Sequence, residues 1–156
     1  FKTSSIWAMF KYLQNYKLFV GQGEQFVCSL LNWKETISIS YCERKKVGAL
    51  IVKDRMIISD GYNGTPSGFE NICEDEENYT KWYVLHAEAN AILKVASSTQ
   101  SCKGATLYIT LSPCRECSKL IHQAGIIRVV YSKIYKDTSG LEFLKRAGVF
   151  LTQINL

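Results

Sequence analysis

The sequence predicts one α/β domain, a three-layer α/β/α sandwich around a mixed five-stranded sheet. Its 156 residues suit a single hydrophobic core. Apolar residues make up 47% of the chain and charged residues 21%, which excludes disordered and collagen-like classes. Helix and strand patterns alternate through the second half, which favours parallel pairing of the last two strands. An early hairpin pattern makes the sheet mixed.

The first part of the chain predicts two helices and a hairpin. We divide the chain into an N-terminal extension of unknown role, residues 1–25, and a main domain, residues 26–156. Residues 1–20 predict a helix, and apolar residues at helical spacing predict a second one: Phe26, Leu30, Trp33 and Ile37. Residues 47–53 and 56–59 predict strands joined by a turn at Asp54-Arg55. A loop over 61–68 and an exposed acidic stretch over 74–77 follow.

The second part predicts three helices that alternate with three strands. Residues 85–96 carry helix formers with few breaks, and residues 105–111 predict a strand. Pro113 suits the opening of a helix over 114–124, which Gly125 ends. A strand over 126–131, a short helix over 139–147 and a final strand over 149–154 complete the chain.

The basic charge balance leaves two interpretations open. A net charge of +5 is compatible with an anionic partner, such as a nucleotide or a nucleic acid, and equally with a solvated surface. The lysines are spread along the chain, which favours the solvated surface. The one tight basic cluster is Arg44-Lys45-Lys46.

The cysteines do not follow the dense pattern of a small secreted disulfide protein, although there are six. No secretory signal is evident, and polar residues interrupt the apolar stretch over 6–20, so we expect no membrane span. We therefore expect a reducing, cytoplasmic setting with four ordinary small cysteines: Cys28, Cys42, Cys73 and Cys102. Acidic Glu74 and Asp75 beside Cys73 leave a second metal site as an alternative.

Two short motifs carry most of the chemical information. His86-Ala87-Glu88 and Pro113-Cys114-Arg115-Glu116-Cys117 offer one imidazole and two thiolates, which fill three of the four tetrahedral positions of zinc. A spacing of three places both cysteines on one helical face at a helix N-terminus, where thiolates are favoured. Glu88 suits proton transfer to and from a water in the fourth position. This arrangement matches the signature of zinc-dependent nucleobase deaminases.

Other interpretations of these residues compete with a catalytic zinc. A Cys-x-x-Cys pair alone is typical of thioredoxin-like redox sites, which lack a ligating histidine such as His86. A closed structural zinc needs a fourth protein ligand, and we find no good candidate. His122 lies in the middle of a predicted helix and suits a structural role.

With these motifs in view, the chain resembles the cytidine deaminase superfamily, and more closely its deoxycytidylate (dCMP) deaminase branch. The resemblance covers about residues 38–150. Beside the zinc motif it is carried by residues 42–49 (CERKKVGA), 61–68 (GYNGTPSG) and 86–92 (HAEANAI). The zinc motif is specific to the superfamily, whereas the last two stretches favour the dCMP branch.

The resemblance implies a role for individual residues. His86, Cys114 and Cys117 would hold catalytic Zn²⁺, and Glu88 would be the proton shuttle. Asn63 would contact the deoxyribose, and the Arg44 guanidinium would grip the 5′-phosphate. Further residues implied near the substrate are Ala87, Ser112 and Tyr131.

The resemblance also implies regulation and assembly. It implies activation by dCTP and inhibition by dTTP, with Mg²⁺ accompanying the triphosphate, as is common in the family, and a homo-oligomer that is a hexamer or a dimer. The residues implied in this regulation are Gly61, Tyr62, Gly64, Thr65 and Pro66.

We therefore expect a deaminase that converts dCMP to dUMP and ammonia and so supplies dUMP for thymidylate synthesis. One alternative is a nucleic-acid deaminase of the tRNA adenosine deaminase type, although the GYNGTP stretch and Asn90-Ala91-Ile92 argue against nucleic acid. The other is a non-enzymatic scaffold that binds zinc or nucleotides, which would have no use for Glu88.

Overall fold

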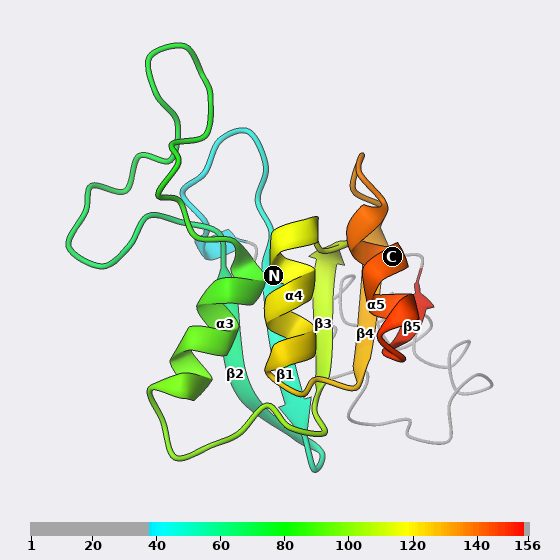
Figure 1. Cartoon of the computed structure of the whole chain (residues 1–156). Coiled ribbons are helices and arrows are strands. Elements are labelled where there is room, and N and C mark those ends of the chain that lie inside the picture. Colours follow the sequence, from blue (N-terminus) through cyan, green and yellow to red (C-terminus); the bar gives the residue numbers. More distant parts are fainter. Residues whose placement is uncertain (1–37, 155–156) are drawn as a thin grey trace, which may run out of the picture.

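A mixed sheet forms the centre of the computed structural model, which describes residues 38–154 (Figure 1). Within that part of the chain its strands are β1 (Gly48–Lys53), β2 (Met56–Tyr62), β3 (Thr106–Leu111), β4 (Arg128–Lys133) and β5 (Phe150–Gln153). The strand order is β2-β1-β3-β4-β5. β1 runs antiparallel to both of its neighbours, whereas β3, β4 and β5 are parallel. The predicted α/β class, the mixed sheet and the parallel last strands are confirmed.

In the described part of the chain, three helices lie on one face of this sheet: α3 (Ala87–Ala96), α4 (Arg115–Gln123) and α5 (Ser139–Arg146) (Figure 1). Their apolar residues pack against the sheet residues Leu107 and Ile109 in one core cluster. Tyr108, between those two, packs with Leu50 and Val130 in a second cluster, because side chains alternate between the two faces of a strand. The predicted helices before residue 38 and the domain boundary at residue 25 lie outside the described residues.

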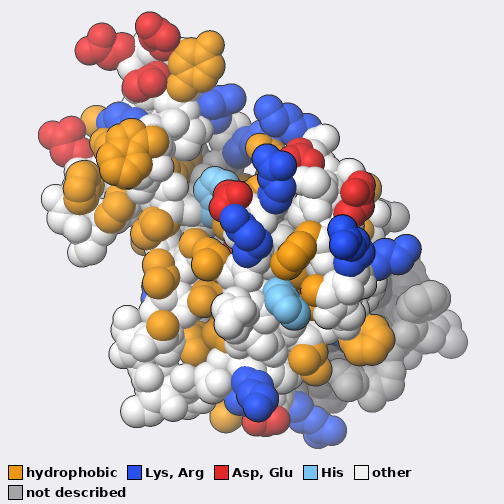
Figure 2. Space-filling model, viewed as in Figure 1, with side chains coloured by type: hydrophobic (Ala, Val, Ile, Leu, Met, Phe, Trp, Pro, Cys, Tyr) orange, Lys and Arg blue, Asp and Glu red, His pale blue; other side chains and the backbone are white. Residues whose placement is uncertain are grey.

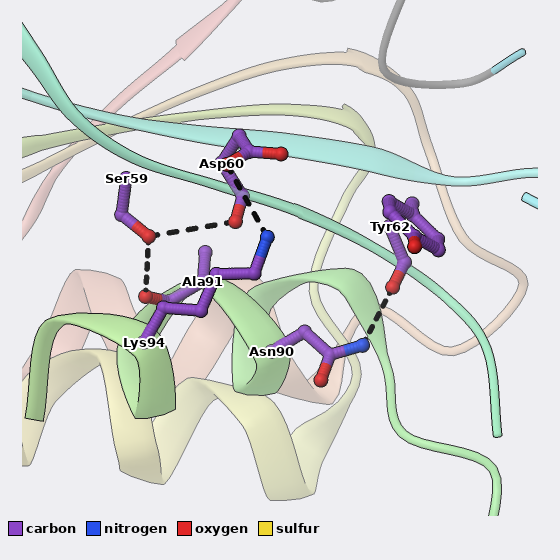
Figure 3. A network of polar contacts seen from close by, with 6 residues as sticks. All are labelled: Ser59, Asp60, Tyr62, Asn90, Ala91 and Lys94. Atoms are coloured by element: carbon purple, nitrogen blue, oxygen red, sulfur yellow. Dashed lines mark hydrogen bonds and ion pairs between the residues drawn. The ribbon is translucent and has the colours of Figure 1, made fainter. Parts of the chain in front are cut away.

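Polar contacts between β2 and α3 fix the position of that helix (Figure 3). The Ser59 hydroxyl donates a hydrogen bond of 2.8 Å to the Ala91 carbonyl, and the Asn90 amide donates one of 2.7 Å to the Tyr62 carbonyl. At the exposed end of the interface, Lys94 forms an ion pair with Asp60. The contacts of Asn90 and Ala91 give part of the HAEANAI stretch a structural role in holding α3.

The predicted loop over 61–68 begins two residues too early, because β2 continues through Gly61 and Tyr62. Gly61 pairs with Ala49 in the sheet and lies against α3. A Cβ at this position would be 2.2 Å from the Ala87 carbonyl oxygen and 2.6 Å from the Ala91 nitrogen. The glycine therefore marks a close approach of strand and helix here, and not the end of the strand.

The segment between β2 and α3 projects from the body of the domain (Figure 1). A disulfide between Cys42 and Cys73 ties it to the segment that precedes β1. The expectation that these two cysteines are ordinary small residues is therefore wrong. They are 31 positions apart in the sequence, but the two segments bring their Cα atoms to 5.1 Å. Cys102 is free and buried, as expected, and Cys28 lies outside the described residues.

Within residues 38–154 the structure contains no helix with the length and apolar character that crossing a membrane requires.

Candidate active site

The two predicted metal-binding motifs meet at the N-termini of neighbouring helices. His86 is the N-cap residue of α3, and Cys114 is the N-cap residue of α4. Both have extended backbone and neither side chain caps its own helix, which leaves the imidazole and the thiol available to a ligand. Cys117 lies in the first turn of α4. The positive end of the α4 dipole therefore lies at both sulfur atoms, where it favours thiolate.

The three ligand atoms have the spacing that tetrahedral zinc requires. Nδ1 of His86 is 3.5 Å from Sγ of Cys114 and 3.4 Å from Sγ of Cys117, and all three atoms lie within 4.8 Å of one another. With Zn–N of about 2.0–2.1 Å and Zn–S of about 2.3 Å, tetrahedral geometry separates nitrogen and sulfur ligands by about 3.6 Å. The residues fit zinc, and three protein ligands are the number that catalytic zinc sites use. Among residues 38–154 they are the one cluster of metal-ligating side chains of this kind.

The three ligands shift one another's pKa values. A hydrogen bond from Cys117, reinforced by His86, lowers the pKa of Cys114 to about 3. The same hydrogen bond raises the pKa of Cys117, and the bond to Cys114 raises the pKa of His86. The Cys114 thiolate therefore favours the protonated forms of Cys117 and His86. A metal that binds here displaces those protons, as thiolate and imidazole ligands require.

Glu88 supplies a carboxyl group that is almost shielded from water. It is the second residue of α3, and only 4% of it is exposed. Burial raises its pKa to about 7, although its own backbone N–H and the nearby His86 act in the opposite direction. A carboxyl group that gains and loses a proton near neutral pH is suited to general acid–base chemistry.

A cavity of about 170 Å³ opens onto His86, Glu88 and Cys114. Part of its wall is apolar and comes from Val47, Val84, Ala87 and Leu111. Polar and charged groups complete the lining: Cys42, Arg44, Lys45, Asn63, Glu74, Thr80, Ser112, Tyr135 and Lys136. Apolar walls suit a flat ring, and three cationic side chains suit an anionic group on the same molecule.

The family model of the cytidine and deoxycytidylate deaminase zinc-binding region matches residues 23–133. The chain belongs to this family. It is 42% identical over 108 residues to the deoxycytidylate deaminase of Mycobacterium phage D29, which covers 60% of this chain and 83% of that protein. It is 35% identical over 153 residues to the deoxycytidylate deaminase of Enterobacteria phage T4, with coverage of 70% and 79% respectively.

A solved structure extends this similarity to three dimensions. The crystal structure of dCMP deaminase from the cyanophage S-TIM5, in complex with dCMP and dUMP, superposes with a TM-score of 0.79 at 43% identity. The match covers 81% of this chain and 94% of that chain. The deaminase fold is therefore shared along most of both proteins.

Four of the five residues predicted to bind substrate in this family member line the cavity: Asn63, Arg44, Ala87 and Ser112. The Asn63 amide is already engaged, because its Oδ1 accepts hydrogen bonds from the Ser40 hydroxyl at 2.9 Å and the Val47 N–H at 2.8 Å. Its Nδ2 donates to the Lys45 carbonyl. Asn63 therefore holds the segment that leads into β1, a structural role that is independent of any contact with a ligand.

Tyr131 lies elsewhere, in the apolar core between the sheet and the helices. The sequence places it at a strand end, but β4 continues to Lys133, so the strand ends two residues later. Tyr135 and Lys136 follow that end and line the cavity. The Ser112 hydroxyl holds this segment by accepting a hydrogen bond of 2.8 Å from the Tyr135 N–H. The signal that sequence reasoning missed is that ligands bind beyond the carboxyl ends of parallel strands.

The residues predicted to be regulatory continue from the end of β2. Gly64 forms an isolated bridge with Leu85, and the Pro66 carbonyl accepts a hydrogen bond in a turn with Phe69. The Thr65 hydroxyl is buried and makes no hydrogen bond to the part of the chain that the structure describes. With Gly61 and Tyr62 in β2, these residues lie beside the N-terminus of α3, on the same segment as the projecting loop.

Proposed function

We propose that the chain catalyses the zinc-dependent hydrolytic deamination of dCMP to dUMP and ammonia. One observation carries this proposal: the zinc ligand set and the buried Glu88 open onto a cavity that three cationic side chains also line. A neutral nucleoside would not need Arg44, Lys45 and Lys136 there, whereas the phosphate of a nucleotide would. The relatives named deoxycytidylate deaminase support the same choice.

Each residue group has a distinct task in this reaction. His86, Cys114 and Cys117 would hold Zn²⁺, which when bound would supply the Lewis acidity that makes water a nucleophile near neutral pH. Glu88 accepts a proton from the attacking water, delivers one to the ring nitrogen and assists the departure of ammonia. Because Glu88 is only 4% exposed, its carboxyl group exchanges protons with the substrate more readily than with bulk water.

The phosphate end of the substrate would meet the basic side of the cavity. Figure 2 shows basic side chains gathered over the upper part of the molecule, next to a projecting segment that carries acidic ones. Arg44 offers a planar pair of donors, and the Lys45 ammonium lies 5.2 Å from the centre of the Tyr135 ring. We propose that these groups select a nucleotide over a nucleoside.

The test is ammonia release from dCMP, CMP and deoxycytidine in parallel, with zinc-loaded protein. We expect kcat/KM to be largest for dCMP and to fall when the phosphate is absent. Turnover of tRNA with none of dCMP would contradict the proposal and favour a nucleic-acid deaminase. Zinc-loaded protein that deaminates none of these substrates would favour a scaffold.

We further propose that dCTP with Mg²⁺ activates the enzyme and dTTP inhibits it, through Gly61, Tyr62, Gly64, Thr65 and Pro66, within a homo-oligomer. The unsatisfied Thr65 hydroxyl and the continuity of this segment with α3 support the proposal. An effector that prefers the active state should shift a sigmoidal dCMP saturation curve to lower concentration. A hyperbolic curve that dCTP leaves unchanged, from a species that light scattering finds monomeric, would contradict it.

A further inference from the structure

A tight acidic turn in the projecting segment begins and ends beside the cavity. Glu74 and Thr80 form an isolated antiparallel bridge, and both residues line the cavity. Between them, the Asp75 carboxylate accepts hydrogen bonds from the Glu77 N–H at 3.1 Å and the Tyr79 N–H at 2.8 Å. These bonds close the turn internally. Its two ends are thus held in a fixed relation to each other.

Both ends of this turn contact Arg44. One carboxylate oxygen of Glu74 accepts hydrogen bonds from the backbone N–H of Glu43 at 3.1 Å and of Arg44 at 3.2 Å. At the other end, the Thr80 hydroxyl accepts a hydrogen bond of 3.4 Å from the Arg44 guanidinium. The backbone and the side chain of Arg44 are therefore held by the same turn. The disulfide between Cys42 and Cys73 joins the residues next to these contacts.

Glu74 is an unusual residue for this position. Only 9% of it is exposed, and it places a carboxylate in the wall of a cavity that is to receive an anionic phosphate. By charge alone it would repel that phosphate. One of its oxygens instead accepts hydrogen bonds from two consecutive backbone N–H groups. Such hydrogen bonds to a charged acceptor are stronger than those between neutral partners. The carboxylate is thus positioned to order the chain that carries Arg44.

We propose that Glu74 is a positioning residue for substrate selection: it holds the Arg44 segment so that the guanidinium meets the phosphate of a nucleotide. This proposal rests on the proposed function, because it assumes that the phosphate of the substrate enters beside Arg44. Glu74 contacts no reacting atom and acts through Arg44. The turn from Glu74 to Thr80 then makes the enzyme specific for phosphorylated substrates.

The sign of the effect separates positioning from simple repulsion. If Glu74 orders Arg44, Glu74→Ala raises KM for dCMP about tenfold and changes KM for deoxycytidine much less. Glu74→Gln keeps an acceptor oxygen and gives an intermediate value. If the carboxylate only repels phosphate, both variants lower KM for dCMP. That result, or an equal loss on both substrates, would overturn the proposal.

Two further variants make the test specific. Glu76→Gln removes the same charge from an exposed position of the same turn, and we expect wild-type kinetics from it. In an Arg44→Ala background, Glu74→Ala should add little to KM for dCMP, because the group that it positions is gone. Additive effects of the two substitutions would contradict the proposal.

Loss of folding and failure of the proposed function remain distinguishable in this design. Melting temperatures show whether the Glu74→Ala protein folds. If it does not, Glu74→Gln shows whether KM for dCMP rises or falls. The inhibition constants of dUMP and deoxyuridine measure the same preference without turnover. The ratio of the deoxyuridine constant to the dUMP constant should fall in Glu74→Ala. Wild-type protein that deaminates neither dCMP nor deoxycytidine would refute the proposed function, whereas wild-type turnover with an unchanged ratio would refute only the role of Glu74.

Discussion

Replacing Gly140 by alanine should disturb the metal centre from a helix that contributes none of its ligands. Gly140 is buried at the start of α5, where this helix meets the N-terminus of α4. A Cβ there would be 2.4 Å from the Pro113 carbonyl oxygen, 2.6 Å from the Ser118 hydroxyl and 2.9 Å from the Cys114 carbonyl carbon. Two of these atoms are backbone atoms of the segment that carries Cys114.

The size of the effect follows from these distances. The shortest unstrained distance between non-bonded heavy atoms is about 3.5 Å, so the added methyl group needs roughly 1 Å of extra room. Overpacking of this kind costs about 1–3 kcal/mol of the free energy of unfolding. Zinc ligands tolerate displacements of only about 0.2 Å, so a shift of the Cys114 segment should also lower zinc affinity by about 10–100-fold.

The assay is zinc affinity by competition with a chromophoric chelator, together with the melting temperature with and without zinc. We expect Gly140→Ala to melt earlier, by about 2–4 °C for each kcal/mol lost, and to give up zinc more readily. Ser139→Ala is the matched control, because it changes the neighbouring position of the same helix without adding an atom near Cys114, and we expect wild-type zinc affinity from it. Wild-type stability and zinc affinity in Gly140→Ala would refute the argument that this close approach holds the site.

Three further outcomes are expected. Glu88→Gln should retain zinc by elemental analysis yet lower kcat for dCMP by about 10²–10⁴, and full activity would rule out the proton shuttle. Gly61→Ala should lose about 1–3 kcal/mol in denaturant unfolding, because its Cβ would be 2.2 Å from the Ala87 carbonyl oxygen; unchanged stability would mean that β2 and α3 separate easily. Cys73→Ser should lose about 2–4 kcal/mol more under oxidising conditions than under reducing ones, since the disulfide closes a loop over a separation of 31 residues; equal losses in both would point to packing instead.

The sequence predicts the metal centre well because its determinants are local. Pro113 directly precedes the N-cap of α4, a spacing of three places Cys117 one turn after Cys114, and His86 stands just before a run of helix formers. The meeting of two helix N-termini then needs only the α/β alternation that brings α3 and α4 to the same face of the sheet. These features depend on neighbours within a few residues, and the structure brings the ligand atoms of His86, Cys114 and Cys117 within 4.8 Å of one another.

The features that sequence reasoning missed depend on segments far apart in the chain. The pairing of Cys42 with Cys73 requires the projecting segment to fold back onto the residues before β1, which no local pattern encodes. Glu74 belongs to a stretch that predicts a solvated acidic surface, yet its backbone donors come from residues 43 and 44. Tyr135 was missed because the end of β4 was placed two residues early. With that error Tyr131, a core residue, was assigned to the substrate site, and Tyr135, which lines the cavity, was not.

The most direct test of the central claim is to titrate metal-free protein with Zn²⁺ while following bound zinc and ammonia release from dCMP in the same samples. We expect activity to rise in proportion to zinc up to one ion per chain, and Cys117→Ser to shift both curves together. Stoichiometric zinc binding without any deamination of dCMP, or full activity in protein free of metal, would contradict it.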